Sequence, residues 1–569
     1  MKQIKLLSFL LFLLMILACN RKNDQLDGEA SDDILINQIG YQTNAEKKAL
    51  IRIDADEFKI RTVDGEEVFA GKTGPWKYWE PSGDSVRLID FSSFMEPGEY
   101  VLCINDTEYS HPFKIGSHLY KDVSDAVLKS YYFARCGVDL DSAFAGAWHR
   151  KAGHPDTSVV VHISAADGFR PKGTIISSPG GWYDAGDYGK YIVNSGISTY
   201  TLLLSSELNK EYHQNQNLNI PESDNEVPDI LDEILVNLKW MLSMQDPNDG
   251  GVYHKLTTKN FVGFVMPDQT TDQRYVVQKS TAAALDFAAT MAHSVKILQS
   301  YGMNGLADQA MQAAEAAYQW ALRHPDIYYH QPEDINTGAY GDNSLVDEWY
   351  WASAEMYLTN TRSRNYFDGM LDHWQKTGTP TWNNVNSLGI ISLLISDERE
   401  KFANVESDFL AYIDQLLDKG NVTPYLISVD KFAWGSNSDV ANEGMLKLIA
   451  FHLTGDEKYL ASARNDLDYL LGRNATAYSF ITGYGSKSPM HPHQRISSAD
   501  GVEDPMPGYL VGGPNINVMT DCDPNEVVRS KFPAASYTDT ECSYSTNETA
   551  INWNAPLVFL VSALDNIDR

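Results

Sequence analysis

The chain has 569 residues, of which 43% are hydrophobic and 21% are charged, and these proportions exclude a chain that is disordered throughout. Its 76 Asp and Glu outnumber its 45 Lys and Arg, which gives a formal net charge of −31. This balance excludes the cationic surface that binding to nucleic acid, or charge-driven docking on an anionic membrane, requires. The 31 Tyr, 21 Phe and 12 Trp favour a neutral ligand on which aromatic rings can stack.

The first residues have the composition of an export signal. Lys2 and Lys5 precede an apolar run over residues 6–18 that is shorter than a membrane-spanning helix. The run ends in the sequence ILAC, which resembles a bacterial lipobox with Cys19 as the lipidated residue. An ordinary signal peptide with an incidental cysteine is the alternative. We predict a signal peptide over 1–18 and a lipidated Cys19 with a polar tether to residue 33, so that acyl chains anchor an exported protein to the outer membrane at the cell surface.

Four further cysteines are present: Cys103, Cys136, Cys522 and Cys542. The export route permits disulfides, but the pairing cannot be deduced from the sequence. No CxxC pair occurs, which disfavours a zinc knuckle.

Residues 34–116 consist of short β-forming runs separated by turn signals. Asp64-Gly65 is a hairpin signal, and Pro97-Gly98 marks a turn before the fifth run. About seven short strands in a segment of roughly this length predict a small immunoglobulin-like β-sandwich. The predicted strands are ILIN (34–37), KALIRI (48–53), FKIRTV (58–63), VRLIDF (86–91), EYVLCI (99–104) and the stretch to Ile115.

From residue 118 to 569 the apolar residues recur at helical spacing. Asp456 can cap a helix in which Leu460, Ala463 and Leu467 recur at intervals of three and four residues. Paired helices in a ring, an (α/α)6 barrel, would bury the inner set and leave loops at one rim for a site, whereas the absence of a fixed sequence repeat disfavours a solenoid. Twelve helices are predicted, near 120–135, 187–208, 226–245, 279–300, 306–323, 347–360, 364–376, 384–397, 404–419, 437–454, 456–472 and 549–567.

The first group of candidate site residues is the pair Asp184 and Asp187, three residues apart in the sequence GGWYDAGDYGKY. A helix cap followed by a first-turn acid is the plain structural interpretation of such a pair. The flanking glycines permit close approach of another group, and the neighbouring aromatic residues are dense. Carboxylates beside aromatic platforms are typical of a site that cleaves sugars.

Two more groups lie in the helix-poor stretch 473–548, and a loop region of that length is usually functional. Glu548 precedes the last apolar segment, and its structural interpretation is again a first-turn acid. His493 and Arg495 form a cluster suited to anions or hydroxyls and poorly suited to a metal, because the guanidinium repels a cation.

These three groups together resemble glycoside hydrolase family 9, the cellulase family E. The spacing His493-x-Arg495 resembles the histidine signature of the family, and Asp184 and Asp187 match its DAGD element. The β-rich segment that begins INQIGY resembles the immunoglobulin-like domain of one subgroup. The resemblance covers nearly all of residues 34–569, and its acidic signature is matched at Tyr537, Asp539, Tyr544, Glu548, Ala550, Asn554 and Ala555.

The resemblance implies an (α/α)6 fold and hydrolysis of β-1,4-glucosidic bonds with inversion. Asp187 then matches the general base, Asp184 helps to position the attacking water, and Glu548 matches the general acid. An inverting site must fit a water between base and sugar, so its acid and base stand ~6.5–9.5 Å apart. An acid far along the chain from the base can meet this need. Glu548 must stay protonated near neutral pH, which requires a raised pKa.

Further residues are assigned to supporting roles by the same resemblance. His493 and Arg495 match sugar-binding groups near the cleaved bond, and Asp539 orients the site. Tyr544 belongs to the acidic signature and is a candidate for substrate binding. Of the aromatic residues in predicted rim loops, we rank only Trp434 as a site residue, because it lies in a loop that resembles one of the family; the others are Trp148, Trp182, Tyr340, Trp349 and Trp382.

No cofactor is required for this chemistry, but many members of the family bind calcium. Asp347 and Glu348 match the helix start that supplies calcium ligands. A downstream acidic ligand is replaced by Asn383 or Asn384, so calcium should bind more weakly than with a full set of carboxylates.

We therefore expect an inverting endo-β-1,4-glucanase that acts at the cell surface on a cellulosic, mixed-linkage or xyloglucan substrate. The chain ends shortly after Glu548 without a cellulose-binding module, which disfavours crystalline cellulose. An exo-acting β-glucosidase of the same family and a catalytically dead glycan-binding protein are the alternatives. The expected partner is a β-glucan, with no nucleic acid, contact with the membrane only through the lipid, and a monomeric protein.

Overall fold

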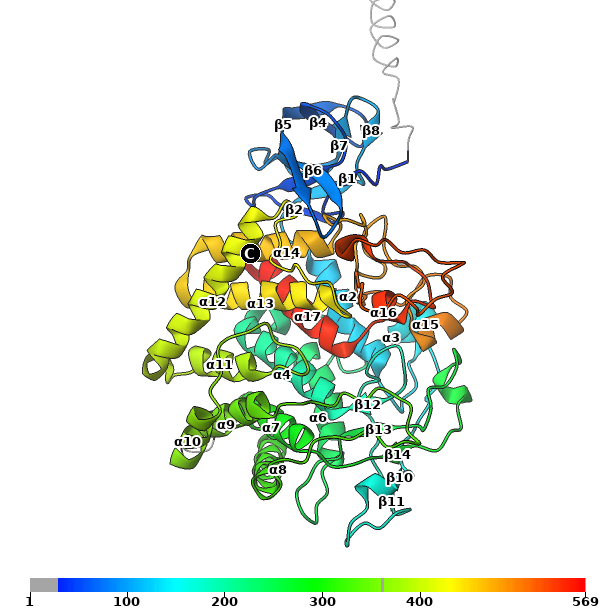
Figure 1. Cartoon of the computed structure of the whole chain (residues 1–569), viewed down its shortest axis with the longest axis vertical. Coiled ribbons are helices and arrows are strands. Elements are labelled where there is room, and N and C mark those ends of the chain that lie inside the picture. Colours follow the sequence, from blue (N-terminus) through cyan, green and yellow to red (C-terminus); the bar gives the residue numbers. More distant parts are fainter. Residues whose placement is uncertain (1–28, 360–362, 568–569) are drawn as a thin grey trace, which may run out of the picture.

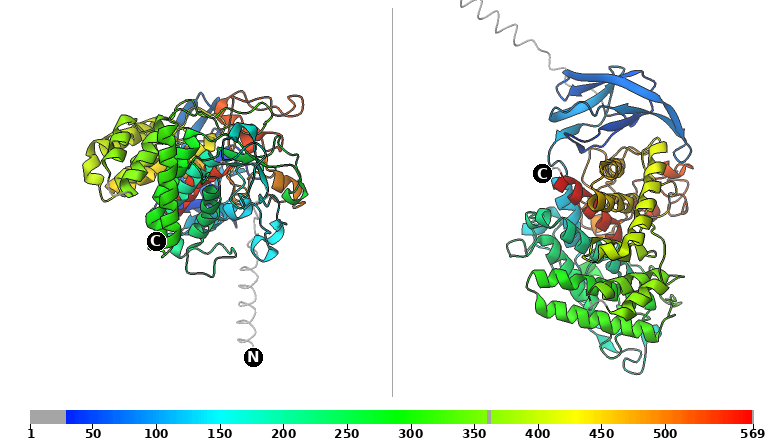
Figure 2. Two further views of the ribbon diagram at one scale, coloured as in Figure 1. Left: turned by 90° about the horizontal axis from the view of Figure 1, so that it is seen from below. Right: turned by 90° about the vertical axis from the view of Figure 1, so that its left-hand side faces the viewer.

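The structure is a computed structural model that describes residues 29–359 and 363–567. A β-domain sits on one end of a larger helical domain (Figures 1 and 2). The predicted signal peptide and Cys19 lie outside the described residues. Within the described ranges, no helix combines the length and the apolar character needed to cross a membrane.

The β-domain is the predicted immunoglobulin-like sandwich. Strand β5 pairs with β4 through its first half and with β6 through its second half, so it runs from one sheet into the other. The two sheets close over a core that includes Tyr41, Phe58, Phe91 and Phe113. The strands are β1 (Ile34–Leu35), β2 (Gly40–Gln42), β3 (Lys48–Ile51), β4 (Glu57–Thr62), β5 (Glu67–Trp79), β6 (Asp84–Asp90), β7 (Gly98–Ile104), β8 (Glu108–Tyr109) and β9 (Phe113–Gly116).

Strand β5, the longest of these strands, is absent from the strands predicted from the sequence. Most of its side chains are exposed or half-buried, so it lacks an apolar alternation. Gly74 and Pro75 interrupt it where the register with β6 shifts, between Thr73 and Trp76. Gly and Pro usually break a strand, and here they sit at an irregularity that bends β5 between the two sheets.

The helical domain is an (α/α)6 barrel, as predicted. Within the described residues, twelve helices of nine or more residues form two rings, and each inner helix contacts the next one around the barrel. The inner helices are buried on nearly all sides, as in NSLGIISLLI of α11. The inner ring is α4 (Ile192–Leu208), α7 (Thr281–Ser300), α9 (Val346–Thr359), α11 (Asn386–Ile395), α13 (Ser436–Thr454) and α17 (Ile551–Ile567); the outer ring is α2 (Lys121–Ala134), α6 (Asp229–Ser243), α8 (Asn304–Arg323), α10 (Arg364–Asp372), α12 (Ala403–Val422) and α14 (Glu457–Leu470).

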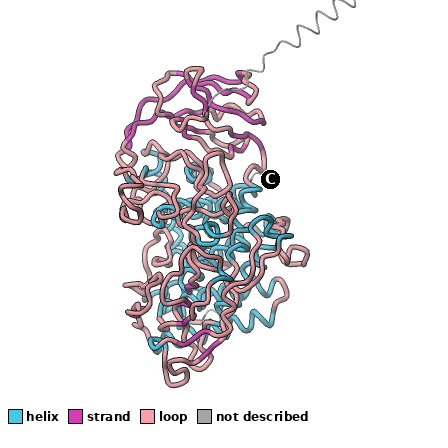
Figure 3. The backbone as a smooth tube through the Cα atoms, turned by 90° about the vertical axis from the view of Figure 1, so that its right-hand side faces the viewer, coloured by secondary structure: helices cyan, strands magenta, loops and turns pink. Residues whose placement is uncertain are grey.

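A small five-stranded sheet was not predicted, because its strands of two or three residues are too short to show a period. It places β12 beside β13, with Tyr191 paired to Lys255. Long loops and short helices dominate the side of the domain that carries this sheet and the segment 473–548 (Figure 3). The strands are β10 (Val159–Val161), β11 (Ile175–Ile176), β12 (Lys190–Tyr191), β13 (Lys255–Thr257) and β14 (Tyr275–Val276); the short helices include α3 (Ser142–Ala145), α5 (Lys210–Gln214), α15 (Arg495–Ala499) and α16 (Tyr544–Asn547).

The hairpin of β5 and β6 connects the two domains. The ring of Trp79, at its tip, lies 4.8 Å from Tyr425 and 5.9 Å from Phe432. The backbone carbonyl of Pro81 accepts a hydrogen bond of 2.8 Å from the N–H of Ala534. The β-domain therefore packs against two loops of the helical domain. One loop leads from Tyr425 through Phe432 to Trp434, and the other contains Ala534.

Candidate active site

Asp184 and Asp187 lie in a glycine-rich loop that precedes β12. The loop is not helical, and α4 begins only at Ile192, so the predicted start of this helix at residue 187 and the cap interpretation of the pair are both wrong. The reason is tertiary: the loop is held from outside, by a backbone hydrogen bond of 2.8 Å from the N–H of Ile551 to the carbonyl of Asp184.

Asp184 is buried at the base of the loop. Its carboxylate accepts hydrogen bonds from the Asn194 amide at 2.9 and 3.0 Å and from the Tyr340 hydroxyl at 2.9 Å. Desolvation and the charge of Asp187 nevertheless raise the pKa of Asp184 to about 8. Asp184 therefore binds its proton more tightly than an ordinary aspartate does.

The carboxylate of Asp187 is held at one oxygen. Oδ2 accepts the Gly189 N–H at 2.9 Å and the Tyr191 hydroxyl at 3.1 Å. Oδ1 carries no such bond among the described residues, so it is available to a water molecule. This is the arrangement that a general base needs, since one oxygen is fixed and the other can accept a proton.

Glu548 lies between α16 and α17 in extended backbone and does not open the last helix, which starts at Ile551. Its backbone runs parallel to that of His493 in a β-bridge, and its carbonyl accepts the Gly512 N–H at 2.8 Å. Pairing with these loops overrides the helical tendency of the segment. Desolvation first, and then the charges of Asp187 and Asp184, raise the pKa of Glu548 well above its usual range.

Gly186 brings the three carboxylates together. A Cβ atom on this residue would lie 2.2 Å from the backbone oxygen of His493 and 3.2 Å from Oε1 of Glu548. The carbonyl of Gly186 also accepts a bond of 2.6 Å from Nη1 of Arg495. A residue with a side chain cannot occupy this position, which explains the glycine between the two aspartates.

A row of rings runs along one wall of the site. Trp434 lies 5.3 Å from Tyr544, which lies 5.9 Å from His493, which in turn lies 5.2 Å from Phe264 (centroid distances). Trp434 is 47% exposed and Phe264 39%, so both present ring surface to a ligand. Polysaccharides bind to such exposed rings through the apolar faces of their sugars. The guanidinium of Arg495 lies behind this row, bonded to the carbonyl of Val262 at 2.9 Å and over the rings of Phe261 and Phe264.

Several of these residues were not predicted from the sequence in their present roles. Phe261 and Phe264 lie in a loop with no signature, and only their spacing in an apolar, turn-rich segment could have suggested exposed rings. Tyr340 was among the aromatic candidates, and Tyr191 among those flanking the aspartate pair, but neither was assigned its hydrogen bond to a carboxylate. Trp182, another candidate, is fully buried in the core.

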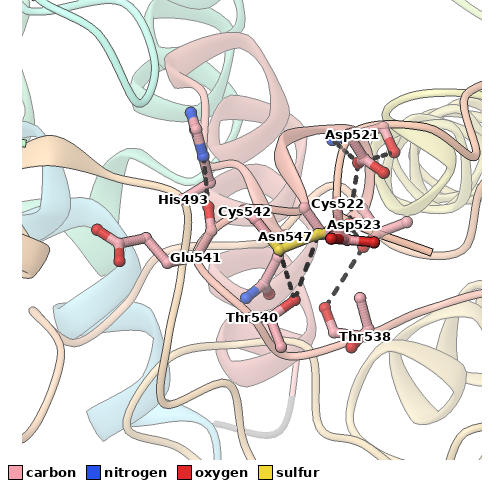
Figure 4. The surroundings of a disulfide bond; sticks show 12 residues. His493, Asp521, Cys522, Asp523, Thr538, Thr540, Glu541, Cys542 and Asn547 are labelled. Atoms are coloured by element: carbon pink, nitrogen blue, oxygen red, sulfur yellow. Dashed lines mark hydrogen bonds between the residues drawn. A yellow bond between two sulfur atoms is a disulfide. The ribbon is translucent and has the colours of Figure 1, made fainter. Parts of the chain in front are cut away.

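Asp539 and a disulfide hold the loops behind His493. The carboxylate of Asp539 accepts the backbone N–H groups of Met490 and His491 at 2.7 and 2.9 Å, so it holds the backbone of this loop and its oxygens are occupied. Cys522 and Cys542 form a disulfide (Figure 4). The carbonyl next to it, on Glu541, lies 2.6 Å from Nδ1 of His493. Nδ1 therefore carries the proton, and Nε2 is left to accept one.

Asp347 and Glu348 lie in the first turn of α9, and both are buried. Oδ2 of Asp347 accepts the Val385 N–H at 2.9 Å. Both carboxylate oxygens of Asp286, on α7, and Oε2 of Glu348 have no hydrogen-bond partner among the described residues. Desolvation, and then repulsion from neighbouring carboxylates including Asp342, raises the pKa of Asp286 and of Glu348 well above the usual range.

Two buried aspartates, a third carboxylate of raised pKa and a wall of exposed rings define a glycoside hydrolase that works by general acid–base catalysis. Glu548 and the aspartate pair come from loops at opposite ends of the barrel sequence, so they can approach a sugar from different sides.

The chain belongs to glycosyl hydrolase family 9. The sequence model of that family matches residues 120–561, and the model of the cellulase N-terminal immunoglobulin-like domain matches residues 29–108. The predicted family, its fold class and a glycoside hydrolase as the class of enzyme are thereby confirmed.

Similar proteins share nearly the full length of the chain. The xyloglucan-specific endo-beta-1,4-glucanase BoGH9A of Bacteroides ovatus is 43% identical over 561 residues, which cover 94% of each chain. Endoglucanase D of Acetivibrio thermocellus is 31% identical over 94% of this chain and 83% of its own. The solved structure of Bacteroides ovatus GH9 has a TM-score of 0.87, with 43% identity, and covers 95% of this chain and all of its own.

The site geometry predicts that Gly189→Ala will impair catalysis. A Cβ atom at this position would lie 2.7 Å from Oδ2 of Asp187 and 2.6 Å from the Tyr191 hydroxyl, so it must push the carboxylate away. We expect kcat to fall by about 10²-fold, because small displacements of catalytic groups have effects of this size. Steady-state kinetics test this loss of kcat, and the melting temperature of the variant shows whether the fold is intact. Gly305→Ala, in open space on α8, is the matched control, and equal kinetics of the two variants would contradict the prediction.

Proposed function

We propose that the protein cleaves internal β-1,4-glucosidic bonds of xyloglucan, a branched β-glucan, with inversion. Glu548 protonates the leaving oxygen, Asp187 takes a proton from the attacking water, and Asp184 positions that water. The observation that carries the proposal is the approach of Glu548 to the aspartate pair across Gly186. The branched substrate is inferred from the relative in Bacteroides ovatus, whose name includes xyloglucan and with which this chain is 43% identical.

The charge distribution supports these roles. Glu548 is the donor because its raised pKa keeps it protonated, whereas Asp187 is fixed by donors to one oxygen that suit its ionised form. Proton transfer from Glu548 leaves a carboxylate near Asp187, and the guanidinium of Arg495 lowers the energy of that product. The water is activated on the other side of the sugar ring, which gives an α-anomer from a β-glycoside.

The test follows the anomeric proton signals by NMR while the soluble protein, lacking residues 1–19, acts on xyloglucan, mixed-linkage β-glucan and cellohexaose. Early appearance of the α-anomer, oligosaccharides of intermediate size and the highest kcat/KM on xyloglucan are expected. An initial β-anomer would overturn the mechanism. Release of only single sugars or disaccharides would replace endo by exo action, and no turnover on any substrate would leave a glycan-binding protein.

We propose further that the buried carboxylates at the start of α9 hold a structural calcium ion. The described residues contain no group of three or more His, Cys, Asp or Glu side chains spaced to bind a metal by themselves. Calcium accepts backbone carbonyls and waters as well as carboxylates, and the oxygens of Asp286, Asp342 and Glu348 that have no hydrogen-bond partner among the described residues are candidate ligands. Asp347 and Glu348 would hold the ion, with Asp286 and Asp342 nearby.

This calcium proposal predicts a pH-dependent stability. Because the folded-state pKa values of Asp286 and Glu348 are raised, the contribution of these two groups to the stability of the metal-free protein is greatest below the unfolded values near 4 and is lost as pH rises toward the folded values. We expect calcium to raise the melting temperature over EDTA, and to do so more at pH 8 than at pH 5. A concentration of 100 times Kd would add about 2.7 kcal/mol. Asp286→Asn should weaken the effect, and an identical melting temperature in calcium and EDTA at pH 8 would exclude the site.

Export and lipidation of Cys19 complete the proposal, with the protein acting as a monomer at the cell surface. Labelling with a radioactive fatty acid should mark the wild type and not Cys19→Ala, and protease added to intact cells should remove the labelled protein. A signal-cleaved, unlabelled protein would favour the ordinary signal peptide. Light scattering on the soluble form checks the monomer.

A further inference from the structure

Lys255 is a buried lysine behind the aspartate pair. It lies on β13 directly across from Tyr191 on β12, and its side chain is inaccessible to solvent. The hydrogen bonds of its ammonium group go to neutral acceptors and not to a carboxylate. A buried charge without an ion pair is costly, so such a residue is retained where its bonds or its field are needed.

The ammonium of Lys255 is bonded to one segment of chain. Nζ donates to the carbonyl of Gly338 at 2.5 Å, to the Thr337 hydroxyl at 3.1 Å and to the Gln331 side chain at 3.0 Å. The neighbouring His254 lies 3.1 Å, through Nε2, from the carbonyl of Tyr340. Lys255, the first residue of β13, and His254, which precedes it, together fix the backbone of residues 337–340.

Tyr340 needs this support because its backbone has φ = +50°, a left-handed conformation that is unfavourable for a bulky residue. The strained backbone sends the Tyr340 hydroxyl to Asp184. The Tyr340 ring also lies 4.7 Å from that of Tyr191, whose hydroxyl bonds to Asp187. Lys255 Nζ lies 5.5 Å from the centroid of the Tyr191 ring.

We propose that Lys255 is a positioning residue for the water-activating pair. It fixes residues 337–340 and the Tyr191 ring so that two tyrosine hydroxyls reach Asp184 and Asp187, and its positive charge stabilises the ionised form of Asp187. This inference rests on the proposed role of the pair in hydrolysis.

Asp187 is the carboxylate that interacts electrostatically with the ammonium group of Lys255. Burial lowers the pKa of Lys255 to about 7, and the carboxylate of Asp187 acts against that shift. The titratable neighbours of Lys255 are Tyr191 and Tyr329, whose pKa values burial raises, and His254, whose pKa burial lowers to about 3, so all three are uncharged at neutral pH.

Asp187 in turn interacts electrostatically with titratable groups from several loops. These groups are Asp184, Glu548, His493, Tyr191 and Tyr340. Of these, Asp184 and Glu548 are held protonated by their raised pKa values. Loss of the Lys255 charge should therefore make Asp187 harder to ionise, and the acid limb of the activity profile should move to higher pH.

The experiment measures kcat, KM and the pH profile of kcat/KM for Lys255→Met, which keeps the shape and removes the charge. We expect kcat to fall about 10- to 100-fold, KM to change little and the acid limb to shift upward. Lys255→Arg should restore the position of the limb. Tyr191→Phe should also lower kcat, and the double variant should lose less than the product of the two single losses, since both act on Asp187.

Lys47 provides the matched control. It is a buried lysine of the β-domain whose Nζ also bonds to backbone carbonyls, those of Thr43, Ala45 and Ser92. Lys47→Met should lower the melting temperature and leave the pH profile unchanged. If Lys255→Met behaves in the same way, Lys255 is merely structural and the inference is overturned. A wild type that hydrolyses none of the glucans would instead overturn the proposed function.

Discussion

Glu548→Gln is expected to lower kcat on xyloglucan by about 10³- to 10⁴-fold, with little change in KM. The amide keeps the shape of the side chain and loses the proton that the leaving oxygen needs. Because the wild-type pKa is raised, activity should persist through neutral pH and fall only as the pH rises through the pKa of Glu548. The alkaline limb of kcat/KM measures this value.

An activated substrate separates this role from general damage. A dinitrophenyl β-glycoside has a leaving group that needs no proton, so Glu548→Gln should retain most of its activity on it. Glu541→Gln is the matched control, because Glu541 is exposed in the same loop and bonds to His493 through its carbonyl. Equal losses on both kinds of substrate would remove Glu548 from the role of acid.

Asp187→Gly should lose about 10³-fold or more in kcat on every substrate, whatever the leaving group, since no carboxylate remains to activate water. Added azide needs no general base, and it should restore turnover with an α-glycosyl azide as product. The pattern is the opposite of that expected for Glu548→Gln, for which an activated leaving group and not azide restores the rate.

Asp308→Asn, on the exposed face of α8, is the control for loss of one negative charge and should behave as wild type. Product analysis by NMR decides the outcome for Asp187→Gly. A β-glycosyl azide would mean that the nucleophile attacks from the other face, and an unimpaired rate would transfer the role of base to another residue.

The sequence was sufficient to propose the residues of the candidate site and insufficient to find the residues that hold them in place. Asp184, Asp187, His493, Arg495 and Glu548 lie in short motifs with fixed spacing, so their presence and order could be read directly. The helix starts assigned to Asp187 and Glu548 were wrong, because acidic residues favour helix starts in general and long-range bonds prevailed here.

The supporting residues could not be predicted because only the fold brings them together. Lys255 meets Tyr191 through a pairing of two short strands, and Tyr340 reaches Asp184 from a loop that follows α8. Strand β5 was missed because its side chains are mostly solvent-exposed, and the pairing of Cys522 with Cys542 required the loop path between them.

The hairpin of β5 and β6 makes the β-domain and the helical domain depend on each other. Trp79 covers Tyr425 and Phe432, and a side chain on Gly83 would collide with Phe532, so the tip of the hairpin fits closely against the helical domain. Phe432 is two residues from Trp434, which presents its ring to the substrate. The β-domain accordingly supports the loop that carries Trp434 from behind. Substitutions at the tip of this hairpin can therefore shift the loop that carries Trp434, and removal of the β-domain would expose the rings of Tyr425 and Phe432.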